Sequence, residues 1–594
     1  MADTIALSPS VKFGGTALAT AWQAALLELR IERALNVPGR VTVRFADPGY
    51  ALLQSGTVSL SETLEVTDPG GRHTLFNGTV TAVGSEQREG EQPELVVVGH
   101  DRSYTLGSTS RVKTWSQLSV SSLLQGLTSS ASGLGVSNES VGPSANTTLD
   151  YVLQVDTDLG LLGELARRGG ADWWVDGSTL YFGKPDELTA KRATTALTLG
   201  DGLFAFSARA LPAPKQVSVS GWDTVQQQTV TGEATSASDG VVASSTLAGL
   251  ATGTGEFVTA ALAARSAAEA DTLSQALFDL RAAAAVEASG TAAGDGSMAP
   301  GGKVTISGAG PLSGTYPLTA VEHLYRPRRG FVTRFRSGDR VPAGLVDGAR
   351  GRSAGFTGSI VGHQGVTAGV VTNINDPTAH GRVKVRFPGM SSTQESAWAR
   401  VVAVGGGTAR GNVFIPEVDD EVLVAFEDGD TRAPVVIGGL YGSKLTMPSV
   451  DLTGGKVQKR ELVSRLGHTL RFLDGTSTDQ KAIELVLAGG QNMVHLGADK
   501  TTVTVKSGNE LSVAVGSTTI TVAQGTGAIS VKAASVQIQA TEQIQLSAPK
   551  ITIASDGTLT LSSDGTLSVT GTSVQVQAKA LLGLTGTPVS INGG

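Results

Sequence analysis

The C-terminal end of the chain repeats one short pattern, in which two apolar residues flank one polar residue and a polar break follows. The two apolar residues lie two positions apart, so on an extended strand both face the same side. The pattern returns every seven or eight residues, and turn formers such as Asp556-Gly557 occupy the breaks. It predicts short strands with one apolar face, and the predicted core residues are Val536, Ile538, Ile544, Leu546, Ile551, Ile553, Leu559, Leu561, Leu567, Val569, Val574, Val576, Leu582, Leu584, Val589 and Ile591.

A single short strand of this kind cannot bury its apolar side alone, but stacked strands can, so the repeat predicts a β-solenoid. Two arrangements fit the pattern equally well. Three repeats of one chain could form each turn of a single-chain β-helix, or three chains could wind together with one strand each per layer. A looser version of the repeat starts at Val494/Leu496, and we therefore place the β-helical segment, here called the needle, at residues 488–594.

Composition limits the chemistry that the chain can perform. It has 594 residues, which is enough for three or four domains. It contains no Cys, which excludes disulfides and thiol chemistry, and its net charge of −7 argues against a nucleic-acid surface. The N-terminus, MADTIALSPSVKFGG, has neither a basic nor a long apolar segment, so we expect synthesis in the cytoplasm without a signal peptide.

The character of the sequence changes several times before the needle. Residues 1–340 are mostly strand-like, with a helix predicted at DLGLLGELARRGG, a long surface loop at 225–256 and an Ala-rich helix at 258–290. Residues 341–365 are a Gly-rich linker. A compact β-segment follows at 366–447, and residues 448–487 connect it to the needle.

The compact segment is predicted to be a small barrel of the OB type, because five short strands, at 368–374, 381–387, 397–403, 421–426 and 433–438, fall within so few residues. OB barrels often bind oligonucleotides through basic and aromatic side chains. The candidates here are Arg382, Lys384, Arg386, Phe387 and Trp398. Alternation along a strand explains the basic residues as its outer face, and acidic residues follow densely, so we predict no nucleic-acid partner.

The barrel segment resembles a known family. GRVKVRFPG, SAWARV, PEVDDEVLVAFEDGD and PVVIGGLYG are similar to the OB-barrel domain of VgrG proteins and of related spike proteins of contractile phage tails. In the first half, YVLQVDTDLGLLGELARRGGADWWVDGSTLYFG, VSVSGWD and GTYPLTAVEHLYRPRRGFVTRF resemble the tail-hub domain of that family. The resemblance covers nearly the whole chain in the order hub, OB barrel and β-helical needle.

The resemblance implies a mainly β protein with some helix, built from tail-hub β-barrel domains, an OB-fold barrel and an intertwined trimeric β-helix needle. It implies a homotrimer without cofactor, metal or enzymatic activity. Inner-tube and baseplate proteins would bind the hub, the assembled particle would be cytoplasmic or released, and the needle would pass transiently through a target cell envelope. A tip protein of the PAAR type would sit on the C-terminal end, at Val589, Ile591, Asn592, Gly593 and Gly594.

We expect none of the extra domains that some family members carry. About 40 residues separate Tyr441 from the first repeats, too few for a lysozyme domain, and the sequence ends with the repeat. The layout therefore resembles the spike of extracellular contractile injection particles at least as much as a type VI secretion VgrG. The alternative is a trimeric β-helical tailspike that binds or degrades polysaccharide. The repeat has no Trp, Tyr or Phe after Phe472 to stack on sugars, which disfavours it.

A few residues could suggest other chemistry. Asp556 and Asp564 lie eight residues apart, as paired carboxylates do in some glycosidases, but each precedes Gly, which favours a tight turn. The seven His residues are scattered and none has metal-ligand spacing. His495 is predicted to point away from the apolar face, although three copies could meet on a trimer axis if the register shifts. Trp173, Trp174 and Trp222 are predicted to be core or subunit-interface residues.

Overall fold

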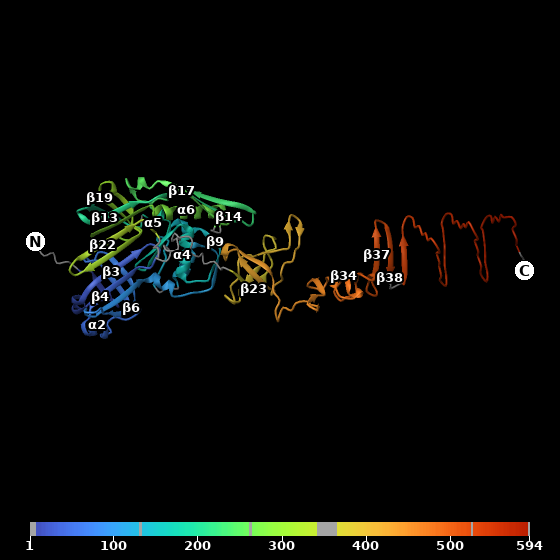
Figure 1. Cartoon of the computed structure of the whole chain (residues 1–594), viewed down its shortest axis with the longest axis horizontal. Coiled ribbons are helices and arrows are strands. Elements are labelled where there is room, and N and C mark those ends of the chain that lie inside the picture. The colour runs from blue at the N-terminus through green and yellow to red at the C-terminus, as the bar shows by residue number, and fades with distance from the viewer. Residues whose placement is uncertain are drawn as a thin grey trace. The chain divides into compact units, whose positions relative to one another are not determined.

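The computed structural model describes residues 8–129, 133–189, 191–260, 264–340, 365–523 and 527–591. The chain forms two compact units, Met1–Met447 and Pro448–Gly594 (Figure 1). Strands dominate both units and the helices are few, so the predicted mainly β class is confirmed. Within the described ranges, no helix has the length and apolar character needed to cross a membrane.

The hub is built on one 15-stranded sheet with two halves, each with its own buried core. Phe45 and Ile31 belong to the first core, Tyr316 and Phe335 to the second. The first half contains β1 (Ser10–Phe13), β2 (Thr16–Ala17), β3 (Leu26–Ala34), β4 (Arg40–Ala46), β5 (Thr63–Thr67), β6 (Thr74–Glu86) and β7 (Glu94–Asp101). The second contains β12 (Thr194–Leu199), β13 (Gly202–Ala210), β16 (Ser244–Ser245), β18 (Val286–Ala293), β19 (Lys303–Ser307), β20 (Gly314–Pro317), β21 (Ala320–Arg326) and β22 (Gly330–Ser337). The halves join where β3 pairs antiparallel with β21.

Two smaller layers complete the hub. One combines the hairpins β8 (Lys113–Ser119) with β9 (Thr148–Gln154) and β10 (Asp172–Asp176) with β11 (Thr179–Gly183), together with α3 (Val120–Thr128) and α4 (Asp158–Gly169). The other packs α6 (Ala267–Ala283) on a sheet of β14 (Ala213–Asp223), β15 (Gln228–Ala234) and β17 (Gly253–Thr259). Shorter helices are α1 (Thr20–Ala25), α2 (Ala51–Gln54) and α5 (Pro185–Thr189).

The predicted helix at DLGLLGELARRGG is α4, and its ends follow from local chemistry. The Thr157 hydroxyl accepts a hydrogen bond from the Gly160 amide at the N-terminus. Arg167 and Arg168 lie in the last turn, where the helix dipole favours cations. Gly170 closes the helix in the left-handed region, at φ 63°. These ends place Arg168 toward the barrel, where the candidate site lies.

The predictions for 225–256 and 258–290 are wrong in their boundaries. The supposed loop contains β15, β16 and the start of β17, and the helix covers only Ala267–Ala283. Ser266 caps α6 by accepting from the Glu269 amide, a capping signal that marks the true start. Val258 belongs to the edge strand β17 and Val286 begins β18, because pairing with neighbouring strands overrides the Ala-rich composition. Leu262, also assigned to the helix, lies outside the described residues.

The OB barrel has the five predicted strands, β23 (Val366–Asn373), β24 (Lys384–Arg386), β25 (Arg400–Val401), β28 (Glu421–Phe426) and β29 (Pro434–Gly439). The second and third strands are shorter than predicted. Their order is β24-β23-β28-β29-β25, and bridges between Val383 and Ala399 and between Arg386 and Glu395 close the barrel. Its core is Val371, Val383, Val385, Phe387, Ala399, Val422, Val424, Phe426 and Val436. The preceding Gly-rich linker, 341–365, lies outside the described residues except at its end.

The second unit begins with antiparallel sheets. The hairpin β30 (Leu452–Thr453) with β31 (Lys456–Val457) comes first. A five-stranded meander, here called the connector sheet, follows with β32 (Lys459–Val463), β33 (Thr469–Asp474), β34 (Lys481–Val486), β35 (Met493–Gly497) and β36 (Thr501–Thr504). A three-stranded sheet contains β37 (Glu510–Val515), β38 (Thr518–Ala523) and β39 (Ala528–Lys532). The solenoid prediction for 488–532 is therefore wrong, because these strands pair antiparallel with their sequence neighbours.

Residues 533–591 have a different character. They carry no strand or bridge, and the chain bends about every eight residues, at the polar breaks predicted from the repeat. In Figure 1 this orange-to-red part of the chain is drawn without arrows. A single-chain β-helix requires ladders between successive turns, and within 533–591 one chain forms none. Of the two solenoid arrangements left open by the sequence, the single-chain one does not match the structure.

Candidate functional site

The predicted needle-core residues lie uncovered in one chain. Every described residue from 534 to 591 is exposed, and the apolar pairs are 48–78% exposed, from Val589 to Ile591. The tip residues Asn592, Gly593 and Gly594 lie outside the described residues. Apolar side chains exposed at this density over a long segment mark a surface that another molecule covers. The assignment of these residues to a core therefore depends on further chains and stays a prediction.

The turns of the needle show why the two aspartates do not form a site. Ser555 accepts a hydrogen bond from the Gly557 amide at 3.2 Å and donates to the Thr558 carbonyl at 3.1 Å. The same two contacts recur eight residues later, from Ser563. The seryl side chains thus hold these turns, while Asp556 and Asp564 are exposed beside them.

The connector sheet has one charged and one apolar face. On the charged face Glu461, Arg471, Glu484 and His495 stand opposite one another on four successive strands. Arg471 pairs with Glu461 at 3.0 Å and with Glu484 at 3.2 Å, and His495 Nδ1 lies 2.8 Å from Glu484 Oε1. His495 therefore points away from the apolar side, in agreement with the sequence-based expectation.

The apolar face of the connector sheet is uncovered in one chain, just as the needle is. Its most exposed members are 41–55% exposed, and they are Leu462, Phe472, Ile483, Leu485, Leu496 and Val503. The charged face is the more enclosed one, since Glu484 is only 8% exposed. A sheet that exposes its apolar side and encloses its ion pairs is built to pack against another apolar surface.

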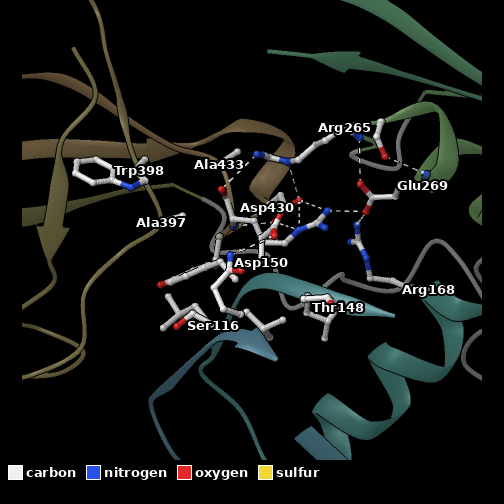
Figure 2. Close-up of a pocket in the computed structure, with 18 of the residues that line it drawn as sticks. Ser116, Thr148, Asp150, Arg168, Arg265, Glu269, Ala397, Trp398, Asp430 and Ala433 are labelled. Carbon is white, nitrogen blue, oxygen red and sulfur yellow. Dashed lines mark hydrogen bonds and ion pairs between the residues drawn. The ribbon is translucent and has the colours of Figure 1, made fainter. Parts of the chain in front are cut away.

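A cavity of about 1920 Å³ lies between the hub and the barrel (Figure 2). Ser116, Thr148 and Asp150 line it from the hub hairpin β8–β9, and Ala397 and Trp398 line it from the barrel. Hub and barrel also touch beside it. Tyr151 Oη donates to the Glu395 carbonyl at 2.9 Å, and the Thr114 amide donates to the Gln394 side chain at 2.9 Å. Burial raises the pKa of Tyr151, so the phenol remains a donor.

At the other side of the cavity, a charge cluster joins three elements of the first unit (Figure 2). Arg168 at the end of α4 pairs with Glu269 in the first turn of α6 at 2.6 Å. Arg432, in the turn after β28, pairs with Glu269 at 2.9 Å and with Asp430 at 2.7 Å. Arg265 lies 3.5 Å from Asp430 and donates to the Arg432 carbonyl.

The pKa directions show that this cluster is charged and mutually compensated. Burial alone would raise the pKa of Asp430 and Glu269, but Arg432 and its arginine neighbours more than offset this and hold both pKa values below the usual range. The carboxylates in turn raise the pKa of Arg432 despite its burial. The cluster therefore acts as a joint between hub and barrel. Both carboxylates are held by arginines, and the cluster leaves no arrangement typical of a general base or a nucleophile.

The basic residues considered for nucleic-acid binding pair with other groups of the barrel itself. Arg382 binds both oxygens of Asp376, at 2.7 and 3.0 Å, and this holds the pKa of Asp376 well below its usual range. Lys384 pairs with Glu395 and Arg400 with Glu427. Phe387 belongs to the barrel core, and Arg386 donates to the Ser392 carbonyl.

Other sequence-based candidates are also placed by the structure. Trp173 and Trp174 are buried in the hub, as predicted. Trp222 is 48% exposed at the end of β14, so the core interpretation is wrong for it, and the interface interpretation stays open. Across the described ranges, no group of three or more His, Cys, Asp or Glu side chains is arranged to hold a metal ion.

The fold and these contacts define a hub, an OB barrel and a needle segment that is uncovered in one chain, in the order that the sequence resemblance implies. The chain matches the phage tail baseplate hub (GPD) family over residues 32–328, half of its length, and it belongs to that family. Residues 367–441 match the type VI secretion system/phage-baseplate injector OB domain.

Individual relatives support the same family. The type VI secretion system spike protein VgrG5 of Pseudomonas aeruginosa is 41% identical over 92 residues, which cover 14% of this chain and 12% of that protein. VgrG3 of Vibrio cholerae is 39% identical over 72 residues, covering 11% and 7%. The chain thus aligns with only a small part of the curated relatives' length. A chain in the Francisella PdpA–VgrG complex matches with a TM-score of 0.51 at 9% identity, over 84% of this chain and 88% of that one, which indicates a shared fold.

Proposed function

We propose that this protein is the structural central spike of a contractile injection machine, a homotrimer whose needle punctures a target envelope when the sheath contracts. One observation carries the proposal. Residues 533–591 hold eight apolar pairs, and these segments have no sheet partner among the described residues of the same chain. Buried backbone groups must be hydrogen-bonded and apolar faces covered, so the segment requires other chains to fold. Two further copies supply identical strands at matching heights.

The connector sheet supports the same assembly. Three copies of its apolar face, placed around one axis, would bury Phe472, Ile483 and Leu485 and leave the Glu461–Arg471–Glu484–His495 rows facing outward. Such a prism resists bending because unfolding it breaks strand pairing and apolar packing in three chains together. The folded monomer would be unstable on its own, as in obligate oligomers.

The remaining parts of the proposal rest mainly on the family resemblance. The hub would bind the inner tube and the baseplate, and the particle would be assembled in the cytoplasm and either retained or released. A PAAR-type tip protein would cover the last strand layer at 589–594, where an uncovered edge invites pairing. The protein would act mechanically and not as an enzyme. Deleting residues 589–594 should abolish co-purification with a co-expressed tip protein, and unchanged co-purification would contradict the tip site.

The test of the main proposal is the mass of the full-length protein in solution by light scattering. The chain has a mass of 60.5 kDa, and we expect three times that value. A well-folded monomer would refute the trimeric spike, since the apolar pairs would then stay exposed. The tailspike alternative also predicts a trimer. Support for it would require that the trimer binds a soluble polysaccharide, measured by calorimetry.

A further inference from the structure

The most exposed apolar segment of the first unit is a long excursion of the OB barrel. Residues 402–418, here called the barrel arm, leave the barrel after β25 and carry the hairpin β26 (Gly406–Gly407) and β27 (Arg410–Gly411) before they return to β28. The hairpin is the pair of short yellow arrows in Figure 1. The apolar side chains of the arm are Val402 (54% exposed), Val404 (84%), Val413 (81%), Phe414 (65%), Ile415 (42%) and Val418 (47%). The barrel core is complete without them.

Part of the arm's backbone also has hydrogen-bonding groups that are not paired within the chain. Residues 412–416 belong to no strand, and none of their amide or carbonyl groups makes a hydrogen bond within the part of the chain that the structure describes. An exposed apolar segment with unpaired backbone groups can pair with a strand or pack into an apolar groove of another chain. Both the side chains and the backbone therefore point to a protein partner.

The composition of the arm indicates a permanent partner. Between residues 402 and 418 the charged residues are Arg410 and Glu417 alone. Permanent interfaces between identical subunits are more apolar than transient ones, which keep a more polar surface. A surface that is exposed only until assembly can tolerate this composition, whereas one that stays exposed before meeting a transient partner invites aggregation.

Chain length brings the barrels of different copies together. Only 12 residues, 440–451, separate the end of β29 from the start of β30, and even fully extended they span at most about 40 Å. If the connector sheets of three chains pack around one axis, as proposed above, this short segment keeps the three barrels within reach of one another. A cyclic trimer also needs a contact between two different surfaces of adjacent copies, since such contacts close into a ring.

We infer that the barrel arm of each copy packs against the barrel or hub of the adjacent copy, forming a collar of three equivalent contacts. This inference rests on the proposed trimer but names a second interface, separate from the needle. The arm contributes Val413 and Phe414 as its central apolar contacts. Its partner is another copy of this chain and not a cargo protein.

The test places a photo-crosslinking residue, p-benzoylphenylalanine, at Val413 of the full-length protein. Because Val413 is 81% exposed in one chain, the change should not disturb folding. The matched control places the same residue at Ser392, an exposed polar position of the same barrel. After irradiation and full denaturation, we expect adducts of two and three chain masses from Val413 and little from Ser392, with the attached peptide mapping to residues 8–440 of a second copy.

The outcomes separate this inference from the proposed function. A trimer by light scattering that gives no copy-to-copy adduct from Val413, or gives adducts only with another protein, would overturn the collar and leave the spike intact. Equal adduct yields from Val413 and Ser392 would also overturn it, since exposure alone would then explain them. A monomer in solution would overturn both proposals.

Discussion

Replacing Ile551 with Asp tests the needle core directly. Ile551 is 50% exposed in one chain, so covering the rest in a trimer stabilises each copy by about 1 kcal/mol, half of the value for complete burial. A carboxylate without a partner in that position costs about 3–5 kcal/mol more. All three copies carry the change, so the trimer should lose about 12–18 kcal/mol. We expect no heat-resistant trimer of Ile551→Asp on an SDS gel.

The matched control is Thr552→Asp. Thr552 is the neighbouring residue, between Ile551 and Ile553, so in an extended strand its side chain faces the opposite side. This variant should form trimers with the heat resistance of the parent protein. A normal trimer of Ile551→Asp would refute an inward-facing Ile551, and equal loss in both variants would show that the strand has no preferred inner face.

Two further changes test the first unit. Arg432→Met leaves Asp430 and Glu269 without their shared cation, and we expect a loss of about 3 kcal/mol in the free energy of unfolding at pH 7. In the parent protein the pKa values of both carboxylates are lower in the folded state than in the unfolded state. Both carboxylates therefore stabilise the fold at pH values above their unfolded pKa, and this contribution is lost as the pH falls toward their folded pKa. The deficit of the variant, measured by urea unfolding, should therefore shrink near pH 4, and an equal deficit at both pH values would contradict this account. Burial lowers the pKa of His323 to about 4. Below pH 6.5 the unfolded chain therefore binds a proton at His323 that the folded chain does not bind until about pH 4. The free energy of unfolding should fall by about 3 kcal/mol from pH 6.5 to pH 4. His323→Gln should remove that part of the pH dependence, and an unchanged slope would show that His323 does not cause it.

The sequence predicted those helices and strands whose ends are marked by neighbouring residues. The α4 helix has its cap, its basic last turn and its closing glycine in consecutive residues, and the five barrel strands are bounded by turn formers. The predicted α6 boundaries were wrong because the Ala-rich composition continues beyond both ends of the helix. Only the Ser266 cap and the pairing of β17 and β18 with distant strands decide where that helix begins and ends.

The charge cluster could not be predicted in the same way. Arg168, Glu269 and Arg432 are separated by more than a hundred residues of sequence, and each one looks like an ordinary surface charge. Folding brings them together at the joint of hub and barrel, where they are partly buried and their ion pairs contribute to stability. The barrel arm could not be predicted either, because exposure, and not composition, distinguishes Val413 and Phe414 from the barrel-core residues of neighbouring strands.

The sequence by itself determined the period of the needle and which residues share a face, because the alternation of a strand and the spacing of its turns are local properties. It left open whether one chain or three complete the solenoid. Tertiary structure decided that residues 533–591 form no ladder within one chain and that the strands within residues 488–532 pair antiparallel. The physical reason is that each strand can pair with its neighbour in sequence or with a strand of another chain, and apolar spacing alone does not choose between these partners.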